Sequence, residues 1–153
     1  MTEHVLPTDA RVAWRDVPVA QRVLSVLTAA LLGVDAFVHL HDAGRYDQFR
    51  TSVLSEGTLF EVQAIVAVLV AIALLLRLGV LTWAVSLLVA GSAAVAVTLY
   101  TYVNVGALGP VPNLYENTWH GPGKVGSAVA ETIAALLAVA GLVLAVRARR
   151  RHS

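Results

Sequence analysis

Residues 59–76 of this chain read LFEVQAIVAVLVAIALLL, an almost uninterrupted run of apolar side chains. Its polar members, Glu61 and Gln63, both lie near its start. A helix needs about 20 mostly apolar residues to cross the hydrocarbon core of a bilayer, and this run approaches that length. Because backbone polar groups in lipid must bond within their own segment, the run predicts a transmembrane helix.

Three further apolar blocks surround this run, and the whole pattern predicts four membrane spans. We place the spans at residues 21–41, 59–77, 79–103 and 125–147. The chain has 153 residues, of which 58% are hydrophobic and 14% are charged, and a soluble domain of this length would need more polar surface. The predicted fold is an all-α, antiparallel, integral membrane four-helix bundle.

Lysine and arginine are distributed unequally between the two sides of this bundle. Arg45, Arg50 and Lys124 fall in the loops 42–58 and 104–124, whereas the other eight of the eleven cations fall on the opposite side. Because cationic segments stay preferentially in the cytoplasm, both termini are predicted to be cytoplasmic. The predicted organisation is therefore a cytoplasmic segment 1–20, a membrane domain 21–147 and a basic cytoplasmic tail 148–153.

Three carboxylates lie inside the predicted spans: Asp35, Glu61 and Glu131. A charge in hydrocarbon is costly, so such residues usually face a bundle interior and often mark function. His39 follows Asp35 by four residues and shares its helical face. Glu61 follows Thr58 by three residues, and this spacing offers a structural explanation, a helix capping box. Glu131 has no such explanation, because it lies well inside its span.

The depth of each polar residue follows from the helical rise of about 1.5 Å per residue. Six candidate ligand-binding residues fall into two layers: Asp35, Thr98 and Glu131 in the deeper one, and His39, Glu61 and Tyr102 nearer the outer surface. If the four spans pack as a bundle, both layers can converge on its axis. The sequence therefore predicts an intramembrane carboxylate and histidine site near the outer face.

Three chemistries remain open for this site. Two neighbouring carboxylates in a low dielectric cannot easily both ionise, so one should hold a proton, which suits a proton relay or the binding of a quinone or another protonatable ligand. Alternatively, His39 with Asp35, Glu61 and Glu131 offers nitrogen and oxygen ligands for a divalent metal. Finally, protonated acids can simply hydrogen-bond neighbouring helices together. The candidate cofactors are therefore a quinone or a divalent metal ion.

Other features of the sequence limit the possible functions. The chain has no cysteine, which excludes disulfides and thiolate metal sites, and its net charge of +1 argues against a nucleic-acid partner. No catalytic motif is present, so no catalytic residue is assigned and the protein is not expected to be an enzyme on its own. Small residues at Gly91, Ala94 and Thr98 form a stripe suited to close helix packing. This stripe favours an alternative, a non-catalytic accessory subunit or homo-oligomer, and a proton-coupled transporter is the third hypothesis.

Several short elements occur in an order known from one family. They are the segment from Gly33 to His39, a polar loop with Tyr46, Glu61 at the start of a span, and the segment from Tyr100 to Asn104. Over residues 21–104 the chain thus resembles the DoxX-like family of small four-span bacterial membrane proteins. The resemblance implies a place in the bacterial inner membrane and a redox-associated role near the quinone pool. The last span and the proline-rich loop before it depart from the family pattern.

Overall fold

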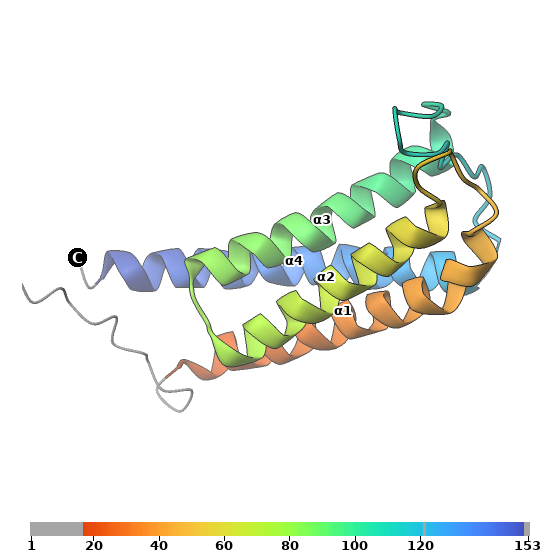
Figure 1. Cartoon of the computed structure of the whole chain (residues 1–153). Coiled ribbons are helices and arrows are strands. Elements are labelled where there is room, and N and C mark those ends of the chain that lie inside the picture. Colours follow the sequence, from red (N-terminus) through yellow and green to blue (C-terminus); the bar gives the residue numbers. More distant parts are fainter. Residues whose placement is uncertain (1–16, 121, 152–153) are drawn as a thin grey trace, which may run out of the picture.

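The computed structural model describes residues 17–120 and 122–151. Within them the chain forms four helices and no strand: α1 (Val19–Tyr46), α2 (Glu56–Leu76), α3 (Val80–Tyr102) and α4 (Pro122–Arg150) (Figure 1). Each helix is long and apolar enough to cross a membrane. The predictions of an all-α chain and of four candidate spans are confirmed. Most of the predicted cytoplasmic segment 1–20 and the end of the basic tail lie outside the described residues.

Helices α1 and α4 extend beyond their predicted spans at both ends and α2 at its start, whereas α3 lies within its predicted span. The first span was expected to end at residue 41, but α1 continues to Tyr46 through Asp42 and Arg45. Similarly, α4 begins at Pro122 and ends at Arg150, so it continues beyond the predicted span 125–147 at both ends. Hydropathy detects where a segment leaves the apolar phase, whereas a helix continues as long as its backbone hydrogen bonds are made.

The start of α2 corrects one prediction about Glu61. Ser55 is the N-cap of α2, and its hydroxyl oxygen accepts a hydrogen bond from the backbone N–H of Thr58 at 3.0 Å. Thr58 therefore occupies the third helical position rather than the cap. The predicted Thr58–Glu61 capping box is wrong, because the helix starts one turn earlier than the apolar run suggested.

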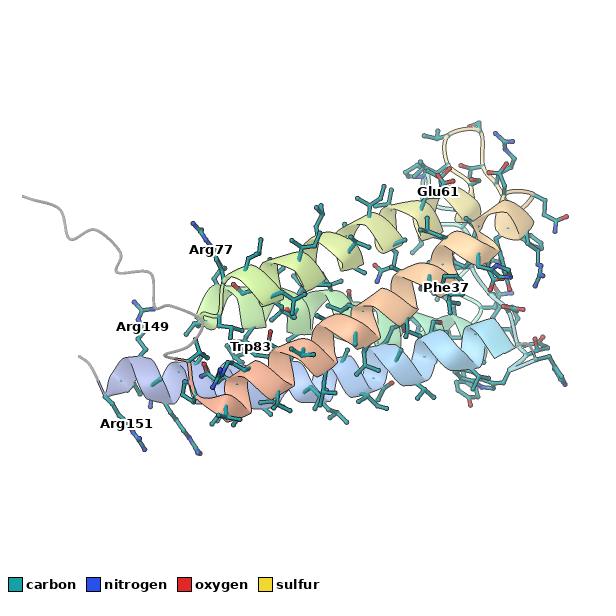
Figure 2. All side chains as sticks on the ribbon, turned by 90° about the horizontal axis from the view of Figure 1, so that it is seen from below. Phe37, Glu61, Arg77, Trp83, Arg149 and Arg151 are labelled. Atoms are coloured by element: carbon teal, nitrogen blue, oxygen red, sulfur yellow. The ribbon has the colours of Figure 1, made fainter. Side chains whose placement is uncertain are left out.

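The four helices pack around a core of small side chains. Helix α1 contacts α2 and α4 extensively, α4 also contacts α3 extensively, and α2 and α3 contact each other less. The largest core side chain is Trp83, and alanines supply most of the remaining core: Ala36, Ala64, Ala67, Ala90, Ala134 and Ala138. Many large apolar side chains point outward instead, such as Phe37, which is 69% exposed (Figure 2). Small residues inside and large apolar residues outside are the pattern expected of helices packed in lipid.

The two ends of the bundle differ in character. The loop between α1 and α2 and the loop between α3 and α4 lie at the same end (Figure 1), where the hydroxyl of Thr51 donates to the carbonyl oxygen of Pro110 at 2.7 Å. The opposite end holds the short connection from α2 to α3 and the C-terminal end of α4. Arg77, Arg149 and Arg151 all lie at this second end (Figure 2).

The contact between α3 and α4 depends on the absence of a side chain at Gly141. A Cβ placed there would lie 2.5 Å from three ring atoms of Trp83, which is fully buried. We expect Gly141→Ala to lower the free energy of unfolding by about 1–3 kcal/mol, because the core must shift to admit the methyl group. Thermal unfolding in detergent micelles measures this loss. Gly33→Ala is the matched control, since a Cβ there meets nothing within 4 Å. Equal melting temperatures for wild type and Gly141→Ala would contradict this packing.

Candidate functional site

Three of the six predicted site residues meet inside the bundle. Asp35 and His39 come from α1 and Glu131 from α4, and one potential ligand atom from each lies within 4.8 Å of the others. The two carboxylates are almost completely buried, Asp35 at 0% and Glu131 at 1% exposure. We call these residues the Asp35–His39–Glu131 cluster. It sits where α1 and α4 pack together, two helices that are distant in sequence.

Some polar atoms of the cluster have hydrogen-bond partners, and others have none. The Nδ1 atom of His39 lies 2.9 Å from Asp35 Oδ1 and 3.0 Å from the main-chain oxygen of Asp35, and it meets hydrogen-bond geometry with the latter. Gln63, from α2, donates to Asp35 Oδ2 at 3.2 Å. Among the described residues, Asp35 Oδ1 and Glu131 Oε2 are buried without a hydrogen-bond partner. Unsatisfied buried oxygens are costly, so a proton, a cation or a ligand donor between them would be stabilising.

A cavity of about 210 Å³ lies beside the cluster. His39, Gln63 and Glu131 give the cavity polar groups. Its apolar walls come mainly from α2 and α3, which contact each other less than the other neighbouring helices do, and they include Leu59, Phe60, Ala93, Ala96 and Val97. The small side chains of α3 leave the space that larger ones would fill. The cavity therefore has apolar walls on α2 and α3 and polar groups on the side of the cluster.

The loop between α3 and α4 closes over the opposite side of the cavity. Glu116 in this loop accepts a hydrogen bond from the hydroxyl of Tyr46 at 3.2 Å. The Nζ atom of Lys124 lies 3.3 Å from the same carboxylate oxygen and donates to the main-chain oxygen of Glu116 at 2.7 Å. All three residues line the cavity. The loop is therefore fastened to α1 and to α4 at the cavity mouth.

The other three predicted site residues do not join the cluster. Glu61 is exposed at the loop end of α2 (Figure 2). Thr98 is exposed, and its hydroxyl donates to the main-chain oxygen of Ala94 at 2.8 Å. Tyr102 is 70% exposed, and its hydroxyl accepts a hydrogen bond from the indole N–H of Trp119 at 3.1 Å. Counting residues along a helix gives depth, but it does not give the direction in which a side chain points.

Sequence reasoning missed several residues of this site. Gln63 had a usable signal, because it is the one amide in an apolar run and lies two residues from Glu61, on nearly the opposite helical face. If Gln63 faces the interior, Glu61 must face outward. Tyr46, Glu116 and Lys124 gave no comparable signal, because their contacts depend on how a loop folds back on the bundle.

The hydrogen bond from Gln63 to Asp35 gives a test of the cluster's stability. Gln63→Leu keeps a similar size and removes the donor, so we expect a loss of about 1.5–3 kcal/mol, the usual range for a hydrogen bond to a charged group. Thermal unfolding in detergent micelles measures this loss of stability. Gln48→Leu is the control, because Gln48 is exposed and donates to the main-chain oxygen of Arg45. A Gln63→Leu variant as stable as wild type would mean that this bond does not stabilise Asp35.

Comparison with known proteins leaves the site as the main guide to function. No family model matches the chain, and neither a curated protein nor a solved structure matches it. Function is therefore inferred from the cluster, the cavity beside it and the loop that closes over both.

Proposed function

We propose that this protein is a multi-pass cell-membrane protein that binds a small, lipid-soluble ligand of the quinone class in the cavity beside the Asp35–His39–Glu131 cluster. The observation that carries the proposal is the composition of the cavity. His39 and Glu131 line it at membrane depth, while its walls on α2 and α3 are apolar. A binding site with mostly apolar walls and a few convergent polar groups is the usual form of a small-molecule pocket.

The polar groups suit a ring that carries hydroxyl groups. Because Nδ1 of His39 is engaged by the main-chain oxygen of Asp35, Nε2 is the nitrogen left for a ligand. Glu131 Oε2 has no hydrogen-bond partner among the described residues and can accept a bond from a ligand hydroxyl. With its Nδ1–H donating to the main-chain oxygen of Asp35, neutral His39 has a lone pair on Nε2, so both protein atoms are acceptors and suit the two hydroxyl donors of a reduced quinone.

The size and the walls of the cavity favour a ligand that is only partly enclosed. About 210 Å³ is less than the roughly 300–1,000 Å³ of pockets that hold drug-sized molecules. This volume suits a single-ring head group whose apolar tail extends into lipid. We place such a tail between α2 and α3, which contact each other sparsely and both line the cavity. The DoxX-like resemblance of residues 21–104 is a separate expectation that points to the same ligand class.

The proposal includes an antiparallel bundle in the bacterial inner membrane with both termini in the cytoplasm. Arg77, Arg149 and Arg151 lie at one end of the bundle (Figure 2), and cationic segments stay preferentially in the cytoplasm. The two loops at the other end then face outward. The cavity mouth, which is bordered by Glu116 and Lys124, then lies on the outer side of the membrane.

The absence of cysteine makes this orientation directly testable. Ser52→Cys and Asn117→Cys place a thiol in each of the two loops at the outward end, and Ser153→Cys places one in the basic tail. In intact cells, a membrane-impermeant maleimide should label the two loop variants and leave Ser153→Cys unlabelled until the membrane is opened. Labelling of Ser153→Cys in intact cells would reverse the orientation.

Ligand binding is tested with decylubiquinol, the reduced form of a short-tailed quinone, titrated without oxygen into metal-free protein in detergent micelles. We expect saturable binding by calorimetry, and Glu131→Gln should weaken it by roughly tenfold, about 1.4 kcal/mol, because a charge-assisted hydrogen bond is lost. Glu61→Gln is the matched control, since it makes the same chemical change on the exposed face of α2. Binding that is absent, or equal in Glu131→Gln and wild type, would refute a ligand site that uses Glu131.

A second pair of variants tests whether the ligand occupies the cavity, without changing the polar groups of the cluster. Ala96 lines the cavity, whereas the neighbouring Val95 is 65% exposed on the outside of α3. Ala96→Phe should fill the space and abolish quinone binding, and Val95→Phe should bind as wild type does. Equal affinities for these two variants would move the ligand away from this cavity.

A further inference from the structure

The cluster holds a donor set that the ligand proposal does not explain. Asp35, His39 and Glu131 supply two carboxylates and one imidazole, with one atom of each within 4.8 Å of the others. Ligand atoms about 2.0–2.2 Å from a metal ion lie about 3–4 Å from one another. Small side-chain rotations would therefore bring all three atoms into a common coordination sphere.

A second observation points to a cation. The buried oxygens without a hydrogen-bond partner among the described residues include one from each carboxylate, Asp35 Oδ1 and Glu131 Oε2. Both side chains are at least nine-tenths buried. The Nδ1 atom of His39 lies 2.9 Å from Asp35 Oδ1 but meets hydrogen-bond geometry with the main-chain oxygen instead, so both carboxylate oxygens stay without a hydrogen-bond donor in the described part of the chain. A positive ion held between them would satisfy both at once.

From this geometry we propose that the cluster binds a divalent first-row transition-metal ion, with Zn²⁺ and Mn²⁺ as the natural candidates. Two carboxylates and a neutral imidazole carry two negative charges, which a divalent ion cancels inside the apolar phase, where net charge is costly. Nitrogen and oxygen donors suit these ions, whereas soft ions such as Cu⁺ prefer sulfur. The chain has no cysteine to supply sulfur.

The surroundings support the three ligands as they do in established metal sites. Gln63 donates to Asp35 Oδ2 and so holds that carboxylate while its other oxygen stays available. The ring of His39 packs edge-on against Phe60, with 5.0 Å between ring centroids. Supporting contacts of this kind orient metal ligands. Because His39 and Glu131 also line the cavity, a further position on the metal would face the cavity, as in sites with three protein ligands and one exchangeable one.

The experiment measures metal binding without any quinone, so it does not depend on the proposed ligand. Purified full-length protein in micelles is stripped with a chelator and then titrated separately with Zn²⁺ and Mn²⁺. Calorimetry and elemental analysis after gel filtration should give one tightly bound ion per chain. Glu131→Gln and Asp35→Asn should each weaken binding by at least about tenfold, as should Gln63→Leu through its support of Asp35. Glu61→Gln should bind as wild type does.

A measurement on unaltered protein guards against variants that fail to fold. Co²⁺ bound to the stripped wild type should give the visible d–d bands of an ion with mixed nitrogen and oxygen ligands, and Zn²⁺ should displace it. No retained metal, or equal retention by wild type and Glu131→Gln, would overturn the proposal and leave at most an adventitious ion. Ala96→Phe distinguishes the two proposals, because it should abolish quinone binding and leave metal binding intact.

Discussion

Two carboxylates buried side by side in an apolar environment constrain this structure more than any other feature. Asp35 and Glu131 belong to helices at opposite ends of the chain, and neither can be exposed to lipid without a large energetic penalty. Each must therefore face the other helix, and the packing of α1 against α4 provides that environment. The donor from Gln63 then also orients α2 toward Asp35. The arrangement of three helices thus follows from the need to compensate two acids.

The same need explains why charged side chains line the bundle interior near the loop end. His39 and Gln63 contact Asp35, Lys124 pairs with Glu116 nearer the loops, and all of these residues except Asp35 line the same cavity. Toward the opposite end the interior is closed by Trp83 and Leu74, both fully buried. Hydroxyl groups also lie there: Ser25 donates to the main-chain oxygen of Leu74 and Ser86 to that of Thr82, both at 2.8 Å. Charged side chains, by contrast, line the cavity between the cluster and the loop end.

The sequence was sufficient for some parts of this arrangement and insufficient for others. Hydropathy alone predicted four helices, because runs of apolar residues have few alternatives in lipid. The pairing of Asp35 with His39 followed from their spacing of four, and the level of Glu131 followed from helical rise. The directions in which Glu61, Thr98 and Tyr102 point could not be predicted in this way. Helical rise gives the depth of a residue, but it does not give the rotation of the helix about its axis. The contacts of Tyr46 and Lys124 with Glu116 were beyond sequence reasoning, since they join residues that are close only after the loop has folded.

The unequal lengths of the helices have a consequence for the cavity. Helices α1 and α4 have 28 and 29 residues, whereas α2 and α3 have 21 and 23. At about 1.5 Å per residue, the longer pair spans roughly 42–44 Å and the shorter pair roughly 32–35 Å. The shorter pair matches a hydrocarbon core of about 30 Å, whereas the longer pair would have to tilt within it or project beyond it. In the proposed membrane position, projection would place Tyr46 and Lys124, near the loop ends of α1 and α4, with the cavity mouth among lipid head groups and water. A molecule in this small cavity would contact the aqueous boundary at one end and the membrane interior at the other.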